Sequence, residues 1–380
     1  MSLQTASALI LTAVCTAFCA AARGAEPASD APSSRTGPVS QAVLTSEQWR
    51  KLDGTVDRAL EYLTTQQGRD GSFNTIDTGQ PGVTALCVLA FLSRGHVPGE
   101  GPYGEPLNRA IDFVLSTQQS DGLLFNLPVG PWSYGSPAHT GIYNHAIAGL
   151  MLAEVYGMAD AEREARIRPA VEKAVEFTLG HQSRFRRNAV EQGGWRYLKL
   201  SDHRSDADLS ITSWQLLFLR SAKNAEFVVP QTAINEAMGY VERCFDARQG
   251  TFMYCIVSGR QTTPAMAGAG IVSLSMGGRH DSDSALRAAQ WMQRLPFASY
   301  GRIDRYHYSA YYCSQAAFQL GGEHWARFYP PLMEALVQNQ NRDGSWEREA
   351  RESQYGSAYS TALSVLALTP PYQILPIYQR

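Results

Sequence analysis

A seven-residue phrase recurs along this chain, and it constrains the fold more than any other feature of the sequence. It reads QGRDGSF at residues 67–73 and QNRDGSW at residues 340–346. A phrase that returns in this way is typical of repeat proteins, in which each unit buries its apolar face only against neighbouring units. The length of 380 residues alone would suggest two or three domains. The repeat predicts one continuous core instead.

Apolar periodicity and turn signals divide residues 45–370 into six helical hairpins. The first helix of each pair has one apolar face, and the second is apolar all round and rich in small residues, as expected of a buried inner helix. The expected first helices cover residues 52–67, 107–118, 167–182, 232–245, 284–295 and 329–340. The expected second helices cover residues 83–92, 141–156, 209–223, 264–276, 309–320 and 357–368. This pattern predicts an all-α fold, an (α/α)6 toroid with an inner and an outer ring of helices.

The first phrase extends backwards to Arg58, Tyr62 and Leu63, which precede Gln67 at fixed distances. This pattern resembles the QW repeat of terpene cyclases such as squalene-hopene cyclase, whose toroid is shared by protein prenyltransferase β subunits. The second, third and sixth repeats keep most of the pattern, and the fourth and fifth are degenerate. The resemblance implies a toroid over residues 45–370, but these repeat residues are structural and identify no substrate.

The N-terminus has the features of an export signal, which we place at residues 1–25. An apolar run at residues 7–19 is followed by small residues suited to cleavage, although no Lys or Arg precedes it. Residues 26–44 are expected to form a disordered linker, and residues 371–380 a C-terminal tail. We therefore expect a periplasmic or extracellular protein. An uncleaved signal, the alternative, would associate the chain with a membrane.

Charge and cysteine content limit the partners and cofactors. The net charge of −2 gives no reason to expect binding to nucleic acid. After signal removal four cysteines remain. Only Cys244 and Cys255 are close in sequence, and whether they form a disulfide stays undecided from the sequence. Cys87 and Cys313 fall on apolar helices and are expected to be buried thiols. The cysteine spacing resembles no zinc motif, and we expect no cofactor.

An acidic turn opens the third inner helix and is the first candidate for chemistry. Class II terpene cyclases carry Asp-x-Asp-Asp at such a position. The resemblance implies that Asp206 is the first carboxylate and that Asp208 is the acid that protonates an alkene or epoxide, with Leu209 replacing the third Asp. Two carboxylates can raise one pKa and create a proton donor. The alternatives are that Asp208 caps the helix while Asp206 satisfies the turn, and that both bind a ligand without chemistry.

Aromatic residues near the starts of the inner helices form the second candidate set. Aromatic faces stabilise carbocations and bind apolar or sugar ligands, although tyrosines at helical spacing also pack cores. The candidate ligand-binding residues are Tyr143, Trp195, Tyr197, Trp214, His307, Tyr308, Tyr311, Tyr312 and Tyr359.

Histidines suggest a metal only weakly. His139, His145 and His203 lie near two inner-helix starts, where each alone is more often structural. Protein prenyltransferases bind zinc through Asp, Cys and His, but Ser309 stands at the position of the family's His and no Asp-x-Cys element surrounds Cys255. We therefore predict no metal site and disfavour a zinc prenyltransferase.

Three functions remain open from the sequence. The first is a protonation-initiated isoprenoid cyclase or isomerase that uses Asp208. The second is a non-catalytic envelope protein that binds a small apolar ligand or a glycan in a central cavity. The third is a scaffold that binds a protein partner through its outer helices.

Overall fold

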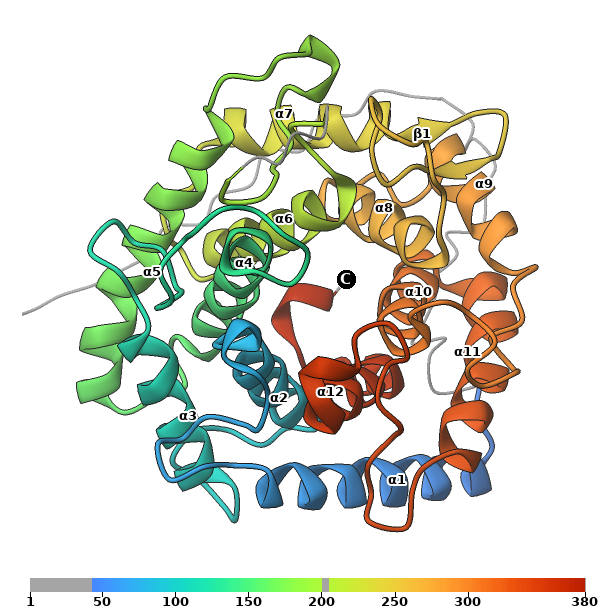
Figure 1. Cartoon of the computed structure of the whole chain (residues 1–380). Helices are drawn as coiled ribbons and strands as arrows, with labels where there is room; N and C mark the ends of the chain where they lie inside the picture. Colours follow the sequence, from blue (N-terminus) through green and yellow to red (C-terminus); the bar gives the residue numbers. More distant parts are fainter. Residues whose placement is uncertain (1–42, 200–204, 380) are drawn as a thin grey trace, which may run out of the picture. The chain divides into compact units, whose positions relative to one another are not determined.

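Inner and outer helices alternate along the chain and form two concentric rings (Figure 1). The outer ring contains α1 (Ser46–Thr65), α3 (Gly104–Ser116), α5 (Ala161–Gln182), α7 (Gln231–Arg243), α9 (Asp283–Met292) and α11 (Gly322–Gln338). The inner ring contains α2 (Gly82–Ser93), α4 (Pro137–Val155), α6 (Leu209–Asn224), α8 (Pro264–Met276), α10 (Tyr306–Leu320) and α12 (Gly356–Leu368). Inner helices pack in chain order and α12 packs against α2, so the inner ring closes. The predicted (α/α)6 toroid is confirmed.

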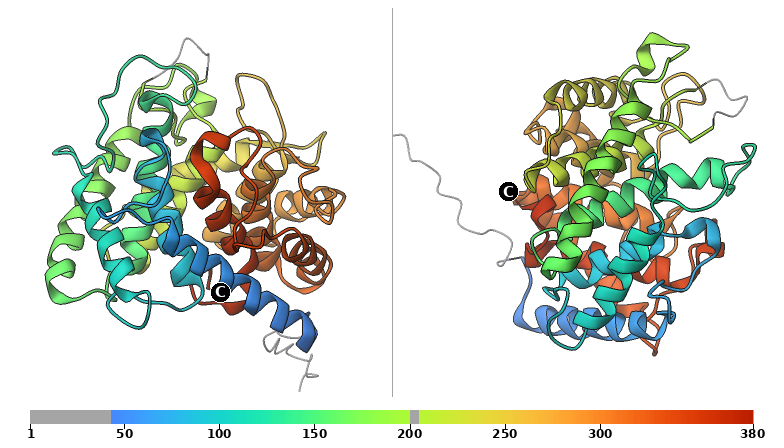
Figure 2. Two further views of the ribbon diagram at one scale, coloured as in Figure 1. Left: turned by 60° about the horizontal axis from the view of Figure 1, so that its bottom comes forward. Right: turned by 90° about the vertical axis from the view of Figure 1, so that its left-hand side faces the viewer.

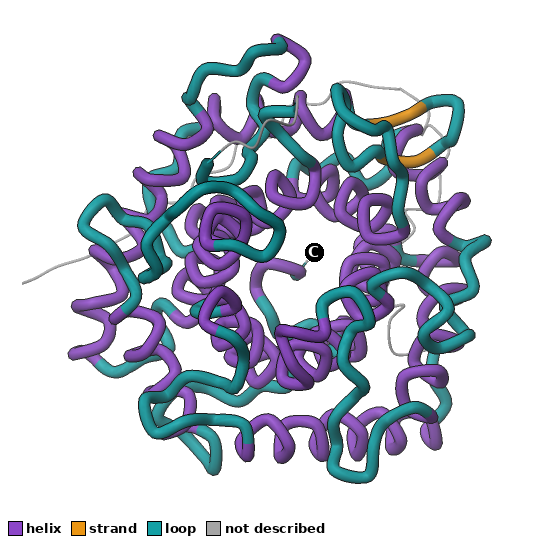
Figure 3. Tube along the Cα trace, viewed as in Figure 1, coloured by secondary structure: helices purple, strands orange, loops and turns teal. Residues whose placement is uncertain are grey.

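The computed structural model describes residues 43–199 and 205–379, which belong to one compact unit. Helices dominate this part of the chain (Figure 3), and β1 (Phe245–Asp246) pairs with β2 (Thr251–Phe252) in a short antiparallel hairpin. Short 3₁₀ turns, η1 to η5, cover Asp77–Gly79, Ala189–Glu191, Ser353–Tyr355, Pro370–Tyr372 and Pro376–Tyr378. No helix among the described residues is long and apolar enough to span a membrane. The expected signal peptide, almost all of the expected linker and His203 lie outside the described residues.

Several helices begin earlier than the sequence pattern predicted. α1 begins at Ser46, with Thr45 as its N-cap in a capping box with Gln48. α4 begins at Pro137, since proline is tolerated in the first turn of a helix. α11 begins at Gly322 and continues through two internal prolines. The polar first turn of α1 and the proline-containing first turn of α4 fell outside the predicted ranges. The missed start of α11 is different, because it includes buried Trp325 and Phe328 at helical spacing with Tyr329.

Small residues set the close spacing of the inner ring. A Cβ atom at Gly268 of α8 would lie 2.6 Å from the carbonyl carbon of Tyr312 in α10. A Cβ atom at Gly149 of α4 would lie 2.8 Å from Cζ of Phe218 in α6. A larger residue at either glycine would push two inner helices apart, so these positions allow the inner helices to pack around one axis.

The recurring phrase joins each repeat to the next. Gln67 Nε2 donates to the carbonyl oxygen of Gly71 in its own turn at 3.1 Å and to the carbonyl oxygen of Pro106 in α3 at 2.8 Å. Gly71 has a φ of 90°, and a Cβ atom there would lie 2.2 Å from the Arg109 carbonyl oxygen, so only glycine fits. The same pair of bonds, one within the turn and one to the next outer helix, is made by Gln118, Gln182 and Gln340.

The last phrase closes the outer ring onto the first helix. Gln340 Nε2 donates to the carbonyl oxygen of Thr55 at 2.9 Å, and Arg58 Nη2 donates to Gln340 Oε1 at 2.5 Å. A Cβ atom at Gly344 would lie 2.2 Å from the Arg58 carbonyl oxygen. The contacts that join neighbouring repeats therefore also join the last repeat to α1.

The segment after α12 packs into one end of the ring, opposite the long loops that precede the inner helices (Figures 1 and 2). Tyr378 of η5 bonds the hydroxyl of Tyr311 in α10, and both side chains are buried. The Ile377 N–H donates to buried Glu154 of α4 at 3.3 Å. The described part of the expected C-terminal tail is thus an integral part of the packed toroid.

The four cysteines in the described residues are all buried free thiols. Cys87 and Cys313 lie on inner helices, as expected. Cys244 and Cys255, for which the sequence left a disulfide open, are not bridged.

Candidate functional site: a central cavity

A cavity of about 370 Å³ lies where the N-terminal ends of the six inner helices converge. Each inner helix contributes at least one side chain or backbone atom to its wall. Small-molecule sites in proteins typically have volumes of about 300–1,000 Å³. The starts of the inner helices therefore surround a space of the size of a small-molecule site.

The cavity wall changes from polar to apolar with depth. Loops that precede the inner helices supply polar and charged residues, which are Tyr134, Gln261, Arg305, Arg351 and Glu352. Positions a turn or more inside the helices supply mainly apolar residues, which are Leu86, Ile147, Trp214 and Leu363. The polar Asn144 of α4 also lies there, with its side chain bonded to the Gly82 N–H and the Thr78 carbonyl oxygen. Tyrosines and His139 line the wall between the polar and the apolar set. The cavity is therefore suited to a ligand with one apolar and one polar end.

Asp208 is fully buried and caps α6. Its Oδ1 accepts the Ile211 N–H at 2.8 Å, as an N-cap does. Its Oδ2 forms an ion pair with Arg196 Nη1, and the two side chains are only 0% and 7% exposed. Burial opposes the charge of Arg196, but Asp208 nevertheless raises the pKa of this guanidinium. Asp208 thus caps α6 and pairs with Arg196 behind the cavity wall rather than on it.

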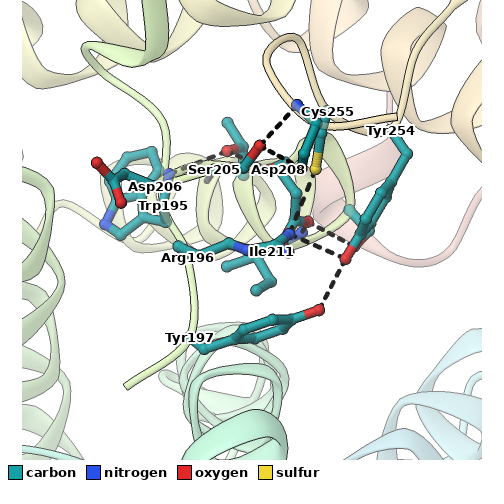
Figure 4. Close-up of polar contacts among 12 residues, drawn as sticks. Trp195, Arg196, Tyr197, Ser205, Asp206, Asp208, Ile211, Tyr254 and Cys255 are labelled. Carbon is teal, nitrogen blue, oxygen red and sulfur yellow. Dashed lines mark hydrogen bonds and ion pairs between the residues drawn. The ribbon is translucent and has the colours of Figure 1, made fainter. Parts of the chain in front are cut away.

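Asp206 has a different arginine as its partner. Arg187 donates to both Asp206 oxygens, through Nε at 3.0 Å and Nη2 at 2.5 Å. Burial opposes ionisation, but these bonds lower the pKa of Asp206 overall. Figure 4 shows the Asp206 carboxylate pointing away from the Arg196–Asp208 pair. The two carboxylates therefore do not share the site that the sequence had suggested, because each is paired with its own arginine.

Hydrogen bonds connect Asp208 to the cavity wall on two sides. Ser210 Oγ donates to Asp208 Oδ1 at 2.7 Å, and the Tyr143 hydroxyl lies 2.6 Å from Ser210 Oγ. On the other side Arg196 Nη1 donates to the Tyr254 hydroxyl at 3.0 Å, and this hydroxyl lies 2.8 Å from that of Tyr197 (Figure 4). The tyrosines Tyr143, Tyr197 and Tyr254 line the cavity. The buried ion pair thus reaches the ligand space through three hydroxyl groups.

Five of the predicted aromatic residues line the cavity: Tyr143, Tyr197, Trp214, Tyr308 and Tyr359. The other four are packed behind the wall. Trp195 is fully buried and donates to the Thr178 carbonyl oxygen at 2.9 Å. Tyr311 stacks on Trp214 with a centroid distance of 5.4 Å, and Tyr312 packs edge-on against the same ring. His307 bonds Ser364 at 2.8 Å. The latter four therefore support the wall.

His139 also lines the cavity, and its ring centroid lies 4.7 Å from that of Tyr197. Burial, with the positive charges of Arg196 and Arg305, lowers the pKa of His139 to about 4. Its Nδ1 accepts the Gly135 N–H at 3.3 Å. At neutral pH the ring is therefore uncharged, and its hydrogen is on Nε2. The other histidine of α4, His145, is buried, and its side chain bonds that of Thr178.

A charged group at the cavity entrance was missed by the sequence analysis. Arg305 Nε donates to Glu352 Oε1 at 2.7 Å, and the Tyr359 hydroxyl donates to Glu352 Oε2 at 2.9 Å. Arg305 directly precedes α10. Its backbone is left-handed, with φ of 49°, a conformation that non-glycine residues seldom adopt. Glu352 lies in the loop before α12. Neither position belongs to a periodic segment, so the sequence pattern carried no signal for them.

No group of three or more His, Cys, Asp or Glu side chains in residues 43–199 and 205–379 is arranged to hold a metal ion.

Comparison with known proteins identifies the fold. No protein-family model matches the chain, and no curated protein matches it. Solved structures do match. The type II terpene cyclase MstE from Scytonema, in complex with geranylgeranyl dihydroxybenzoate, has a TM-score of 0.55 at 14% identity, over 87% of this chain and 100% of the cyclase. The chain has the α/α-toroid fold.

Other toroids with different activities are equally similar. A D-mannose isomerase has a TM-score of 0.59 at 13% identity, over 87% of this chain and 99% of the isomerase. A glycosidase has a TM-score of 0.56 at 13% identity, over 88% of this chain and 100% of the glycosidase. At such identities the likeness shows the fold alone, so the function has to be argued from the cavity.

Proposed function

We propose that the protein binds a small amphipathic ligand of isoprenoid type in its central cavity. The observation that carries this proposal is the gradient from aliphatic side chains deep in the cavity to tyrosine hydroxyls and charged groups near its entrance. An apolar chain would bury its surface against Leu86, Ile147 and Leu363, and a polar end would meet the tyrosines. The export-like N-terminus leads us to place this function outside the cytoplasm.

A glycan fits the cavity less well. The deep wall offers aliphatic surface, against which sugar hydroxyls would lose their hydrogen bonds to water without new partners. The cyclase neighbour, whose structure contains a geranylgeranyl compound, adds support for an isoprenoid by analogy of fold.

A cavity-filling substitution tests the proposal. Ile147 lines the cavity and is 8% exposed, so Ile147→Trp would fill the space that the apolar chain needs. Val228→Trp is the matched control, because Val228 is 89% exposed and is not among the residues that line the cavity. The protein would be purified without detergent, and its organic extract analysed by mass spectrometry.

We expect an isoprenoid in near-stoichiometric amount from the wild type and from Val228→Trp, and none from Ile147→Trp. As an independent measurement, farnesol would be titrated against the empty protein while the tryptophan fluorescence, to which Trp214 in the cavity wall contributes, is followed. The proposal fails if the wild type retains no isoprenoid and farnesol does not bind, or if the cavity-filling variant binds as well as the control.

An isomerase- or cyclase-type reaction is the second candidate, and the hydrogen-bonded path from Asp208 through Ser210 to Tyr143 favours it. Asp208 does not touch the cavity, so it would act as a positioning residue or proton acceptor through Tyr143. Its pairing with Arg196 makes direct protonation of an alkene by Asp208 the less favourable version of this reaction.

Product analysis by gas chromatography and mass spectrometry would test for turnover of the retained ligand. If this path is used, Ser210→Ala should slow turnover strongly, whereas Asp206→Asn, outside the path, should not. Equal rates in the two variants would remove the catalytic candidate and leave binding alone.

A further inference from the structure

The buried Arg196–Asp208 pair fixes the direction of the hydrogen bonds that reach the cavity. Asp208, as the anionic partner of Arg196, can only accept, so the single hydroxyl hydrogen of Ser210 is used on Asp208 Oδ1. The bond between Ser210 and Tyr143 must then be donated by Tyr143. The Tyr143 hydroxyl has no hydrogen left for a ligand, and it faces the cavity as an acceptor.

The opposite direction is set on the other side of the ion pair. Arg196 donates to the Tyr254 hydroxyl, which also bonds the Tyr197 hydroxyl. Two hydroxyl hydrogens belong to these tyrosines, and their mutual bond uses only one. Whichever of them donates, one hydrogen has no acceptor among the described residues. The Tyr197–Tyr254 pair therefore faces the cavity as a donor.

The charges around the cavity are balanced among the described residues. Arg196 pairs with Asp208, and Arg305 pairs with Glu352. Arg351 pairs with Asp304 at 3.0 Å. His139 is uncharged at neutral pH. The cavity thus offers no unpaired cation to a phosphate or carboxylate, and burying such an anion there would be costly.

We propose, on the basis of the binding function proposed above, that the polar end of the ligand is an uncharged hydroxyl group, which accepts from the Tyr197–Tyr254 pair and donates to Tyr143. An alcohol satisfies both the donor and the acceptor side of this wall. A carbonyl or an ether leaves the Tyr143 side without a hydrogen. A diphosphate brings charge that the wall does not compensate.

A series of probes with one apolar chain tests this assignment: farnesol, farnesal, farnesyl methyl ether and farnesyl diphosphate. Dissociation constants would be measured at neutral pH by the change in tryptophan fluorescence on binding. One hydrogen bond between uncharged groups contributes about 0.5–1.5 kcal/mol, so farnesol should bind roughly two- to tenfold more tightly than farnesal or the methyl ether. Farnesyl diphosphate should bind most weakly.

Two variants separate the role of the ion pair from a general effect on folding. In Ser210→Ala the Tyr143 hydrogen is released, so Tyr143 can donate to a carbonyl and the preference for farnesol over farnesal should disappear. Tyr156→Phe also removes a hydroxyl, but from a tyrosine that bonds Arg168 outside the cavity, and it should keep the wild-type preference.

Equal affinities for farnesol and farnesal in the wild type, or an unchanged preference in Ser210→Ala, would overturn this inference. If these probes still bind and Ile147→Trp weakens all of them, the proposed binding function stands without it. If none of the four probes binds, the isoprenoid proposal itself fails, and the hydroxyl assignment with it.

Discussion

Replacing Gly344 with alanine should weaken the toroid at the point where the ring closes. Gly344 has a φ of 91°, a left-handed conformation that costs an L-residue about 1–2 kcal/mol. The added Cβ atom would also lie 2.2 Å from the Arg58 carbonyl oxygen, so α1 would have to move away from the last repeat. That movement would strain the bonds from Gln340 to Thr55 and from Arg58 to Gln340, each worth about 1 kcal/mol.

The sum is a loss of about 3–4 kcal/mol in the free energy of unfolding, which is large against the usual stability of about 5–15 kcal/mol. Urea unfolding followed by circular dichroism would measure it. Gly180→Ala in α5 is the matched control, because nothing lies within 4 Å of a Cβ atom there, and a helical Gly→Ala change gains up to about 1 kcal/mol. A loss below about 1 kcal/mol for Gly344→Ala would refute the argument that this turn closes the ring.

Three further predictions concern buried groups. Asp208→Ala should lower the free energy of unfolding, measured in urea, by about 3–5 kcal/mol because it leaves Arg196 buried and unpaired. Asp206→Ala should lower it by about 1 kcal/mol because its partner Arg187 is 48% exposed. Equal losses in the two variants would contradict this. Burial raises the pKa of Glu154 from 4.5 to about 7, so the folded state favours its protonated form, and stability should fall by up to about 3 kcal/mol as the pH rises from 4.5 through 7. Glu154→Gln should flatten this slope, and a slope unchanged in the variant would show that other groups cause it. Cys87, Cys244, Cys255 and Cys313 should resist a thiol reagent in the native protein and react after unfolding, and native labelling of any of them would contradict their burial.

The sequence was sufficient to predict the architecture because the architecture depends on local, repeated signals. Gln67 and Gly71 occupy their positions for reasons of backbone bonding and conformation that recur at Gln340 and Gly344. The apolar inner helices likewise follow from periodicity. The beginning of α1 was misplaced because its first turn is mostly polar, whereas the beginning of α11 was missed although buried Trp325 and Phe328 continue the helical spacing of Tyr329.

The site was predicted in part. Tyr143 and Trp214 line the cavity because they lie near the starts of inner helices, as the fold requires. Tyr311 does not line it, because its ring stacks on Trp214 and its hydroxyl bonds Tyr378 behind the wall, contacts that the sequence pattern does not show. The role of Asp208 depends on Arg196, which lies in an irregular segment with no pattern that could reveal the pairing. Tyr254 and Glu352 come from loops and were missed for the same reason.

The closure of the outer ring has a consequence for the order in which the chain can fold during synthesis. The partner of Arg58 in α1 is Gln340, which is 282 residues further along the chain. While the ribosome makes the intervening repeats, α1 can pack against α2 but lacks its neighbours on the other side. The apolar residues that α1 presents to α11 and α12 therefore stay accessible to chaperones, or to another nascent chain, until translation is almost complete.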